Sequence, residues 1–165
     1  MKVGYIFPGQ GSQYVGLGKD LYNNSPEAKV VFDEAENILP DLNLKKLCFE
    51  GPIEELTQTV NNQVAILVTS IAALRALGSR LPSVSLGFAE RRALGTGKAE
   101  NALQPSAFSL QPVVCAGLSL GEYSALVASR VLEFQDAVRL VRRRGELMER
   151  SAKNNPGAMA SILGI

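Results

Sequence analysis

The sequence predicts an α/β fold with a mainly parallel sheet, and three observations carry this prediction. Residues 3–7 and 113–116 are short apolar runs typical of strands, and each is followed by a glycine-containing turn. Segments with helical spacing lie between and after these runs. One of them, residues 63–77, is apolar nearly all round, as expected of a buried helix. Strands that alternate with helices form parallel sheets covered by helices.

In chain order, residues 3–7 form the first strand, and the turn residues of 8–13 end it. Residues 27–39 carry apolar side chains at helical spacing, with Ser25 as the helix cap and Pro26 in the first turn. A short apolar stretch follows at 44–49, then one or two helical turns at 53–59, then the 63–77 helix with Asn61 or Asn62 as its cap.

Residues 82–111 keep neither a strand period nor a helix period and are interrupted by glycine and proline, so we interpret them as an inserted surface loop. The elements expected after the loop are a buried parallel strand at 113–116, a tight turn at 117–121, helices at 122–129 and 134–152, a turn at 154–157 and a further strand from 158 to 165.

Composition excludes several classes of protein. A chain of 165 residues suits one domain or the larger part of one, and a net charge of +1 excludes a strongly basic nucleic-acid binder. No apolar run reaches the roughly 20 residues that span a bilayer. Cys48 and Cys115 have apolar neighbours and are interpreted as small core residues, not as a disulfide or metal site. We therefore expect no nucleic acid, membrane or metal ion as a partner.

The pentapeptide at 117–121, GLSLG, is a G-x-S-x-G motif between an apolar strand and a helix. In that context Ser119 lies on a strained turn that projects its hydroxyl from the sheet, and the N–H of Leu120 can stabilise an oxyanion. The alternative is a glycine-rich turn in which Ser119 only caps the helix.

Residues 7–13, FPGQGSQ, match neither a Walker loop nor a dinucleotide fingerprint. They form a flexible loop of backbone N–H groups at the carboxyl end of a strand, where open α/β sheets bind ligands. An ordinary turn is the alternative.

In the 134–152 helix, Arg144 falls within the apolar stripe formed by Ala137, Leu140, Leu147 and Met148. A guanidinium on a core-facing stripe is costly unless it meets an anion, and its planar fork fits a carboxylate. An ion pair within the protein remains the alternative.

Together these segments resemble the malonyl-CoA:acyl carrier protein transacylase family, which includes the acyltransferase domains of fatty-acid and polyketide synthases. The matching motifs are residues 7–13 (FPGQGSQ), 116–126 (AGLSLGEYSAL), 136–148 (DAVRLVRRRGELM) and 157–159 (GAM). The resemblance implies an α/β-hydrolase-like core with a nucleophile elbow over residues 1–152. It also implies that a small, truncated ferredoxin-like subdomain begins at 153–165, so that the chain is the N-terminal half of a cytoplasmic enzyme and inactive by itself.

By this resemblance, Ser119 is acylated by malonyl-CoA and passes the malonyl group to the thiol of acyl carrier protein, without a cofactor. The backbone N–H groups of Gln10 and Leu120 would form the oxyanion hole. Arg144 would pair with the free malonyl carboxylate, and Gln63 would line the same pocket.

The chain departs from the family pattern at the residue before the serine, where Leu118 replaces the usual histidine. The family's catalytic histidine belongs to the half that follows, and this chain contains no histidine at all. Two other functions remain open: a serine esterase or thioesterase, which shares the G-x-S-x-G motif, and a non-catalytic module that binds carrier protein through the basic residues of 139–150.

Overall fold

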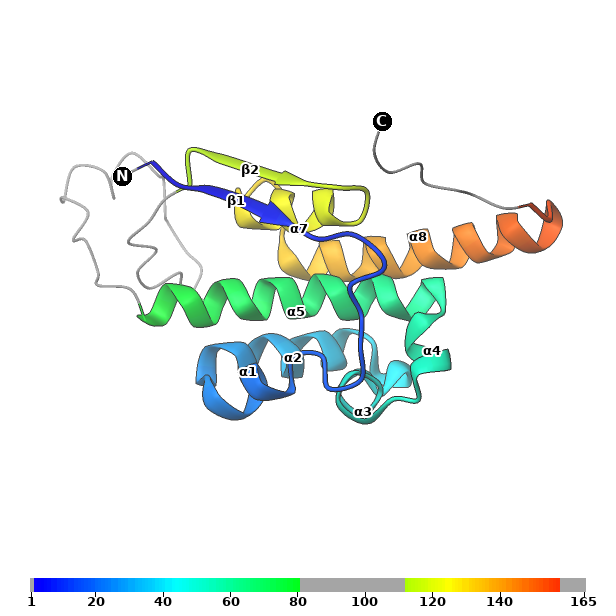
Figure 1. Cartoon of the computed structure of the whole chain (residues 1–165), viewed down its shortest axis with the longest axis horizontal. Helices are drawn as coiled ribbons and strands as arrows, with labels where there is room; N and C mark the ends of the chain where they lie inside the picture. Colours follow the sequence, from blue (N-terminus) through cyan, green and yellow to red (C-terminus); the bar gives the residue numbers. More distant parts are fainter. Residues whose placement is uncertain (1, 81–111, 158–165) are drawn as a thin grey trace, which may run out of the picture.

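The computed structural model describes residues 2–80 and 112–157, which form layers of helices with a small sheet on one side (Figure 1). The elements are β1 (Gly4–Phe7), α1 (Lys19–Asn24), α2 (Pro26–Ile38), the 3-10 helix η1 (Pro40–Leu42), α3 (Leu44–Glu50), α4 (Ile53–Thr57), α5 (Thr59–Arg80), β2 (Val114–Gly117), α7 (Gly121–Ala128) and α8 (Phe134–Asn154). The loop expected at 82–111 and the strand expected at 158–165 lie outside the described residues.

The long helix α5 lies between two layers (Figure 1). On one side it contacts α1, α2 and α4, and on the other it contacts α7 and α8. Every residue from Asn62 to Val68 is buried, which confirms the predicted buried helix. The expectation that no segment reaches the length and apolar character of a membrane span was wrong for residues 59–79, but 61% of the most apolar stretch is buried inside the structure, as in a core helix.

The sheet brings two distant segments together. β1 and β2 are parallel neighbours, with Gly4 opposite Val114 and Phe7 opposite Gly117. Because both strands end at the same edge, the 8–13 loop and the 118–120 turn leave the sheet side by side. The predicted parallel pairing of strands with helices beside them is confirmed.

Close backbone packing fixes α8 against the start of α5. A Cβ atom on Gly145 would lie 2.6 Å from the Cα of Val60, so the two helices touch without an intervening side chain. One turn further along α8, the carboxylate of Glu149 accepts a hydrogen bond from the Val60 N–H at 3.0 Å. α8 therefore caps α5.

This tertiary cap explains why the predicted start of the α5 helix was wrong. Asn61 and Asn62 lie inside the first turn and do not cap the helix, which begins at Thr59. At α2 the prediction is confirmed, because the Ser25 hydroxyl accepts a hydrogen bond from the Ala28 N–H at 3.2 Å. The sequence did not predict α1 or η1, which are too short to show a clear period.

The predicted apolar faces are buried only in part. On α8, Val138, Val141 and Gly145 pack into the core, whereas Leu140 is 48% exposed and Leu147 is 47% exposed. The apolar stripe of α8 is wider than its contact with α5, so the prediction that both leucines face the core was wrong.

The burial predicted for the second strand was also wrong. Val114 in β2 is 58% exposed, and Ile6 in β1, which is opposite Ala116, is 86% exposed. Within residues 2–80 and 112–157, helices cover only one face of this two-stranded sheet, and these side chains belong to the other face.

Candidate active site

The turn that carries Ser119 is strained, as the sequence predicted. Ser119 has φ of 53°, in the left-handed region that costs a residue with a side chain about 1–2 kcal/mol. Leu120 is the cap residue of α7, and no side chain makes a cap hydrogen bond there. The Ser119 hydroxyl is therefore not used as a helix cap, and the alternative interpretation of the motif was wrong.

Both glycines of the motif are required because backbone atoms of a neighbouring residue lie too close for a side chain. A Cβ atom on Gly117 would overlap the backbone of Gly121, and one on Gly121 would overlap the carbonyl oxygen of Phe7. The first turn of α7 thus packs directly on the ends of β1 and β2. A residue with a side chain at either position would push the turn away from the sheet.

The loop after β1 lies against this turn. A Cβ atom on Gly9 would lie 2.7 Å from the carbonyl oxygen of Leu118. The Ser12 hydroxyl donates a hydrogen bond to the Gly9 carbonyl at 3.0 Å and closes the loop on itself. Gln10 is exposed next to the turn, and Leu120 is completely buried at the start of α7.

The guanidinium of Arg144 joins three elements. Its Nη2 donates a hydrogen bond to the Oγ of Ser119 at 2.8 Å, and its Nη1 donates one to the Oε1 of Gln63 at 2.6 Å. The ring of Tyr123 lies below it, with 5.8 Å from the guanidinium carbon to the ring centroid. The structure therefore brings together three of the five predicted site residues.

Arg144 has no carboxylate partner among the described residues. Its neighbours on α8 do: Arg139 pairs with Asp136 at 3.2 Å, and Arg143 pairs with Glu146 at 3.0 Å. Arg144 is half-buried, and its N–H groups donate hydrogen bonds to neutral oxygen atoms only. Its other neighbour is the aromatic ring of Tyr123. An ion pair within the described part of the chain does not account for this residue.

Two residues around Arg144 were not identified as site residues from the sequence. Tyr123 follows the serine turn, and Met148 was assigned to the apolar stripe. The Sδ of Met148 accepts a hydrogen bond from the Nε2 of Gln63 at 3.2 Å. The only signal in the sequence was the spacing, since Met148 follows Arg144 by four residues and shares its helix face.

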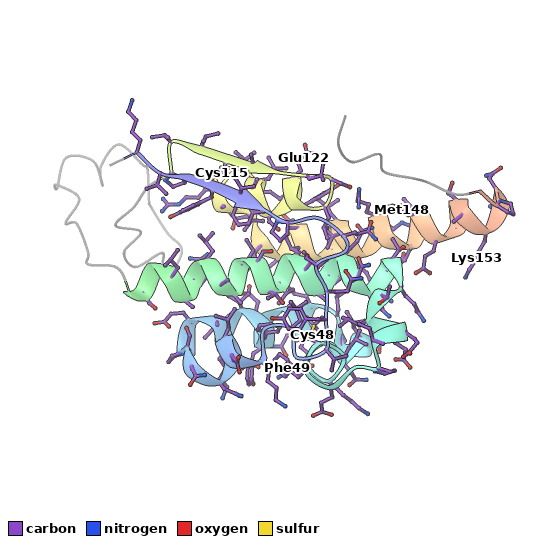
Figure 2. All side chains as sticks on the ribbon, viewed as in Figure 1. Cys48, Phe49, Cys115, Glu122, Met148 and Lys153 are labelled. Atoms are coloured by element: carbon purple, nitrogen blue, oxygen red, sulfur yellow. The ribbon has the colours of Figure 1, made fainter. Side chains whose placement is uncertain are left out.

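Burial disfavours the thiolate form of both cysteines. Cys48 is buried and free, and burial, with a smaller effect of Glu36, raises its pKa to about 12. Cys115 is half-buried and free, and burial raises its pKa as well. They lie in different layers (Figure 2), as expected for cysteines that form no disulfide with each other.

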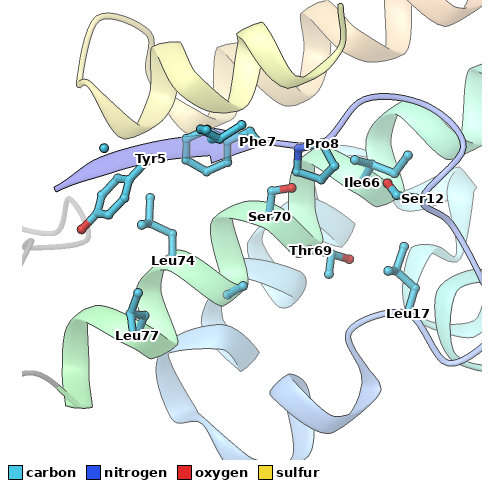
Figure 3. Close-up of a pocket in the computed structure, with 13 residues that line it drawn as sticks. Tyr5, Phe7, Pro8, Ser12, Leu17, Ile66, Thr69, Ser70, Leu74 and Leu77 are labelled. Atoms are coloured by element: carbon cyan, nitrogen blue, oxygen red, sulfur yellow. The ribbon is translucent and has the colours of Figure 1, made fainter. Parts of the chain in front are cut away.

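A separate cavity of about 520 Å³ lies between β1 and α5 (Figure 3). Most of its lining is apolar, including Phe7, Ile66 and Leu74, with hydroxyl groups at Thr69 and Ser70. Its described lining residues include no charged side chain, and neither Ser119 nor Arg144 is among them.

Comparison with known proteins finds similar sequences and structures. Residues 4–84 match the family described as acyl transferase domain. Malonyl CoA-acyl carrier protein transacylases from Bacillus subtilis and Haemophilus influenzae are 44% and 38% identical to the chain over 164 residues. Each match covers 99% of this chain and 43% or 44% of the relative. The chain thus spans less than half the length of the curated relatives that it matches.

Solved structures of the same kind have the same fold. The transacylase from Helicobacter pylori has a TM-score of 0.72 at 32% identity, over 93% of this chain and 41% of that one. A complex of a type II PKS acyl-carrier protein with its malonyl-transacylase matches with a TM-score of 0.66 at 36% identity, over 92% of this chain and 40% of that one. Over nearly its whole length the chain is therefore similar to one part of the malonyl CoA-acyl carrier protein transacylases, and residues 4–84 match the acyl transferase domain family.

Proposed function

We propose that this chain carries the nucleophile and the carboxylate-binding arginine of an acyltransferase. The enzyme would move a malonyl group from malonyl-CoA to the thiol of acyl carrier protein in fatty-acid biosynthesis. The observation that carries the proposal is the half-buried Arg144 guanidinium, which meets only neutral partners and lies 2.8 Å from the Ser119 hydroxyl. A positive charge in that position favours an acyl group that ends in a carboxylate.

In the first step, the Oγ of Ser119 attacks the thioester carbonyl of malonyl-CoA and its hydroxyl proton passes to a base. CoA then leaves as the thiol that takes up this proton, which produces a malonyl ester on the serine. In the second step, the carrier-protein thiol attacks this ester and releases Ser119. The backbone N–H groups of Leu120 and Gln10 would hold the oxyanion in both steps. This assignment is supported by the start of α7 at Leu120 and by the contact of Gly9 with the turn.

The malonyl carboxylate would compete with Ser119 for the Nη2 N–H groups of Arg144. Substrate binding would then move the guanidinium from the nucleophile to the carboxylate, while Gln63 keeps its hydrogen bond to Nη1. Acetyl groups lack a carboxylate and would leave the contact between Arg144 and Ser119 in place.

The proposed enzyme needs a base that these 165 residues do not supply. The chain has no histidine, and Glu122, three residues after Ser119, is exposed. We therefore expect residues 1–165 to be acylated slowly and not to turn over. The same proposal includes an α/β-hydrolase-like core at 1–152, a ferredoxin-like subdomain that begins at 153–165, a cytoplasmic location and no cofactor.

The test is mass spectrometry of the full chain after incubation with malonyl-CoA, with the Ser119→Ala variant as control. We expect one malonyl adduct on the peptide that contains Ser119, and none in the variant. An adduct on Cys48 or Cys115 contradicts the assignment. Steady hydrolysis of simple esters without transfer to carrier protein would favour an esterase. Carrier-protein binding that is unchanged in Ser119→Ala, with no adduct in either protein, would favour a binding module.

A further inference from the structure

The side chain of Gln63 is completely buried, so both the oxygen and the nitrogen of its amide need a hydrogen-bond partner within the protein. Leaving either atom without a partner in a buried position is unfavourable. The Oε1 accepts from Arg144 and the Nε2 donates to the sulfur of Met148. Both ends of the amide are therefore engaged, one by a donor and the other by an acceptor.

These two partners select one of two orientations of the amide. The oxygen and nitrogen of a glutamine side chain are similar in size, so shape alone fits either orientation. With the amide reversed, its NH2 group would face the N–H groups of Arg144, and two sets of donors would meet. The thioether of Met148 can only accept a hydrogen bond, so it favours the orientation in which the oxygen faces Arg144.

The three residues are held in register by the packing of α5 on α8. Arg144 and Met148 are one turn apart on the same face of α8. Figure 2 shows Met148 on this helix. Gln63 approaches them from α5. The contact of Gly145 with Val60 brings the two helix backbones together nearby.

We propose that Met148 is a positioning residue for Arg144. Its sulfur holds the Gln63 amide with the oxygen toward the guanidinium, and the bond from Oε1 to Nη1 directs Nη2 to Ser119. The expected effect on acyl selectivity rests on the proposed carboxylate-binding role of Arg144. The orientation of the amide does not depend on that role and is tested separately.

The first test is NMR spectroscopy of the ligand-free full chain with ¹⁵N-labelled glutamine and arginine side chains. Met148→Leu removes the sulfur and conserves the apolar volume. Leu132→Met, at a half-buried position between α7 and α8, makes the reverse exchange away from the site. We expect the side-chain signals of Gln63 and Arg144 to shift in Met148→Leu and to stay in place in Leu132→Met. Unchanged signals in Met148→Leu overturn the proposal.

The second test compares the affinities of the chain for malonate and for acetate. We expect Met148→Leu to reduce the preference for malonate by about threefold to tenfold, the factor for one lost hydrogen bond. Met148→Gln restores an acceptor at the same place, so it should keep the preference within about twofold of the parent. Thermal unfolding of each variant is measured alongside.

Equal loss of preference in Met148→Leu and Met148→Gln, with unfolding midpoints unchanged, would mean that packing and not the acceptor matters, and would overturn the proposal. If the parent chain itself shows no preference for malonate, the proposed function fails at this site. The NMR comparison still decides the orientation of Gln63 in that case.

Discussion

The α2–α3 pair and the α5–α8 pair each contain a half-buried cation, and the two cations have opposite surroundings. On α3, the Nζ of Lys45 lies 2.8 Å from a carboxylate oxygen of Asp33 and 2.7 Å from one of Glu36. On α8, Arg144 donates to the neutral side chains of Gln63 and Ser119. The first cation is neutralised by its own fold, whereas the second has no counter-charge within the described residues.

This difference distinguishes a cation that is paired within the fold from one whose charge is available to an external anion. Lys45 ties α3 to α2, and its two carboxylates leave little attraction for an external anion. Arg144 keeps its attraction for an anion because neutral oxygen atoms satisfy its N–H groups without cancelling its charge. Three predictions test the comparison and a fourth tests the serine turn that Arg144 contacts, and the expected effects decrease from the first to the last.

The largest effect is expected at Arg144. Arg144→Ala should reduce the preference of Ser119 for malonyl-CoA over acetyl-CoA by about 2–4 kcal/mol, because the carboxylate loses its partner. The measurement is the ratio of single-turnover acylation rates for the two thioesters. Arg143→Ala, which removes an exposed guanidinium paired with Glu146, is the matched control and should leave the ratio unchanged. Equal loss for both thioesters would show that Arg144 supports structure only.

The serine turn should be intolerant of a single added methyl group. Gly121→Ala places a Cβ atom on the carbonyl oxygen of Phe7 and should lower the free energy of unfolding by about 1–3 kcal/mol. At Gly157 the nearest atom to an added Cβ is 3.9 Å away, so Gly157→Ala should change stability by less than about 0.5 kcal/mol. Urea unfolding measures both. Equal stability of the two variants would argue against the close packing of α7 on β1.

Removing each cation tests the comparison directly. Lys45→Met leaves Asp33 and Glu36 without their partner and should lower the free energy of unfolding by about 1 kcal/mol. Arg144→Met removes a half-buried charge that has no counter-ion, which offsets the loss of the donor to the buried Gln63 Oε1, so it should lower stability by less than Lys45→Met does. Urea unfolding of the two variants decides. A greater loss in Arg144→Met than in Lys45→Met would reverse the roles assigned to the two residues.

The smallest effect is the pH dependence of the Lys45 network. Burial alone would raise the pKa of Asp33, but hydrogen bonds from Lys45 and Tyr22 outweigh it and hold the pKa below its usual value. The stability that this carboxylate contributes is therefore present above the unfolded pKa of about 4 and is lost as the pH falls through the lower folded pKa. The difference in unfolding free energy between the parent and Lys45→Met should shrink below about pH 4. A difference that stays constant down to strong acid contradicts this assignment.

The local elements that a sequence encodes by short-range rules were predicted well. The Ser25 cap with Pro26, the apolar α5 and the strand–turn–helix around Ser119 depend on neighbours along the chain, and each is present. The bounds that failed depend on distant partners. The start of α5 was misplaced because Glu149, 89 residues away, caps it.

The sequence by itself determined that the chain is an α/β protein with a serine on a strained turn and a cation near an apolar helix face. These features follow from residue spacing and from the geometry of glycine and serine in turns. Only the tertiary structure decided which partners the cation has. The pairing of β1 with β2 and the close packing of α5 on α8 place Gln63, Ser119 and Arg144 within hydrogen-bond distance, and they leave Leu140 and Leu147 exposed. Such contacts join segments far apart in the chain, so no local pattern records them.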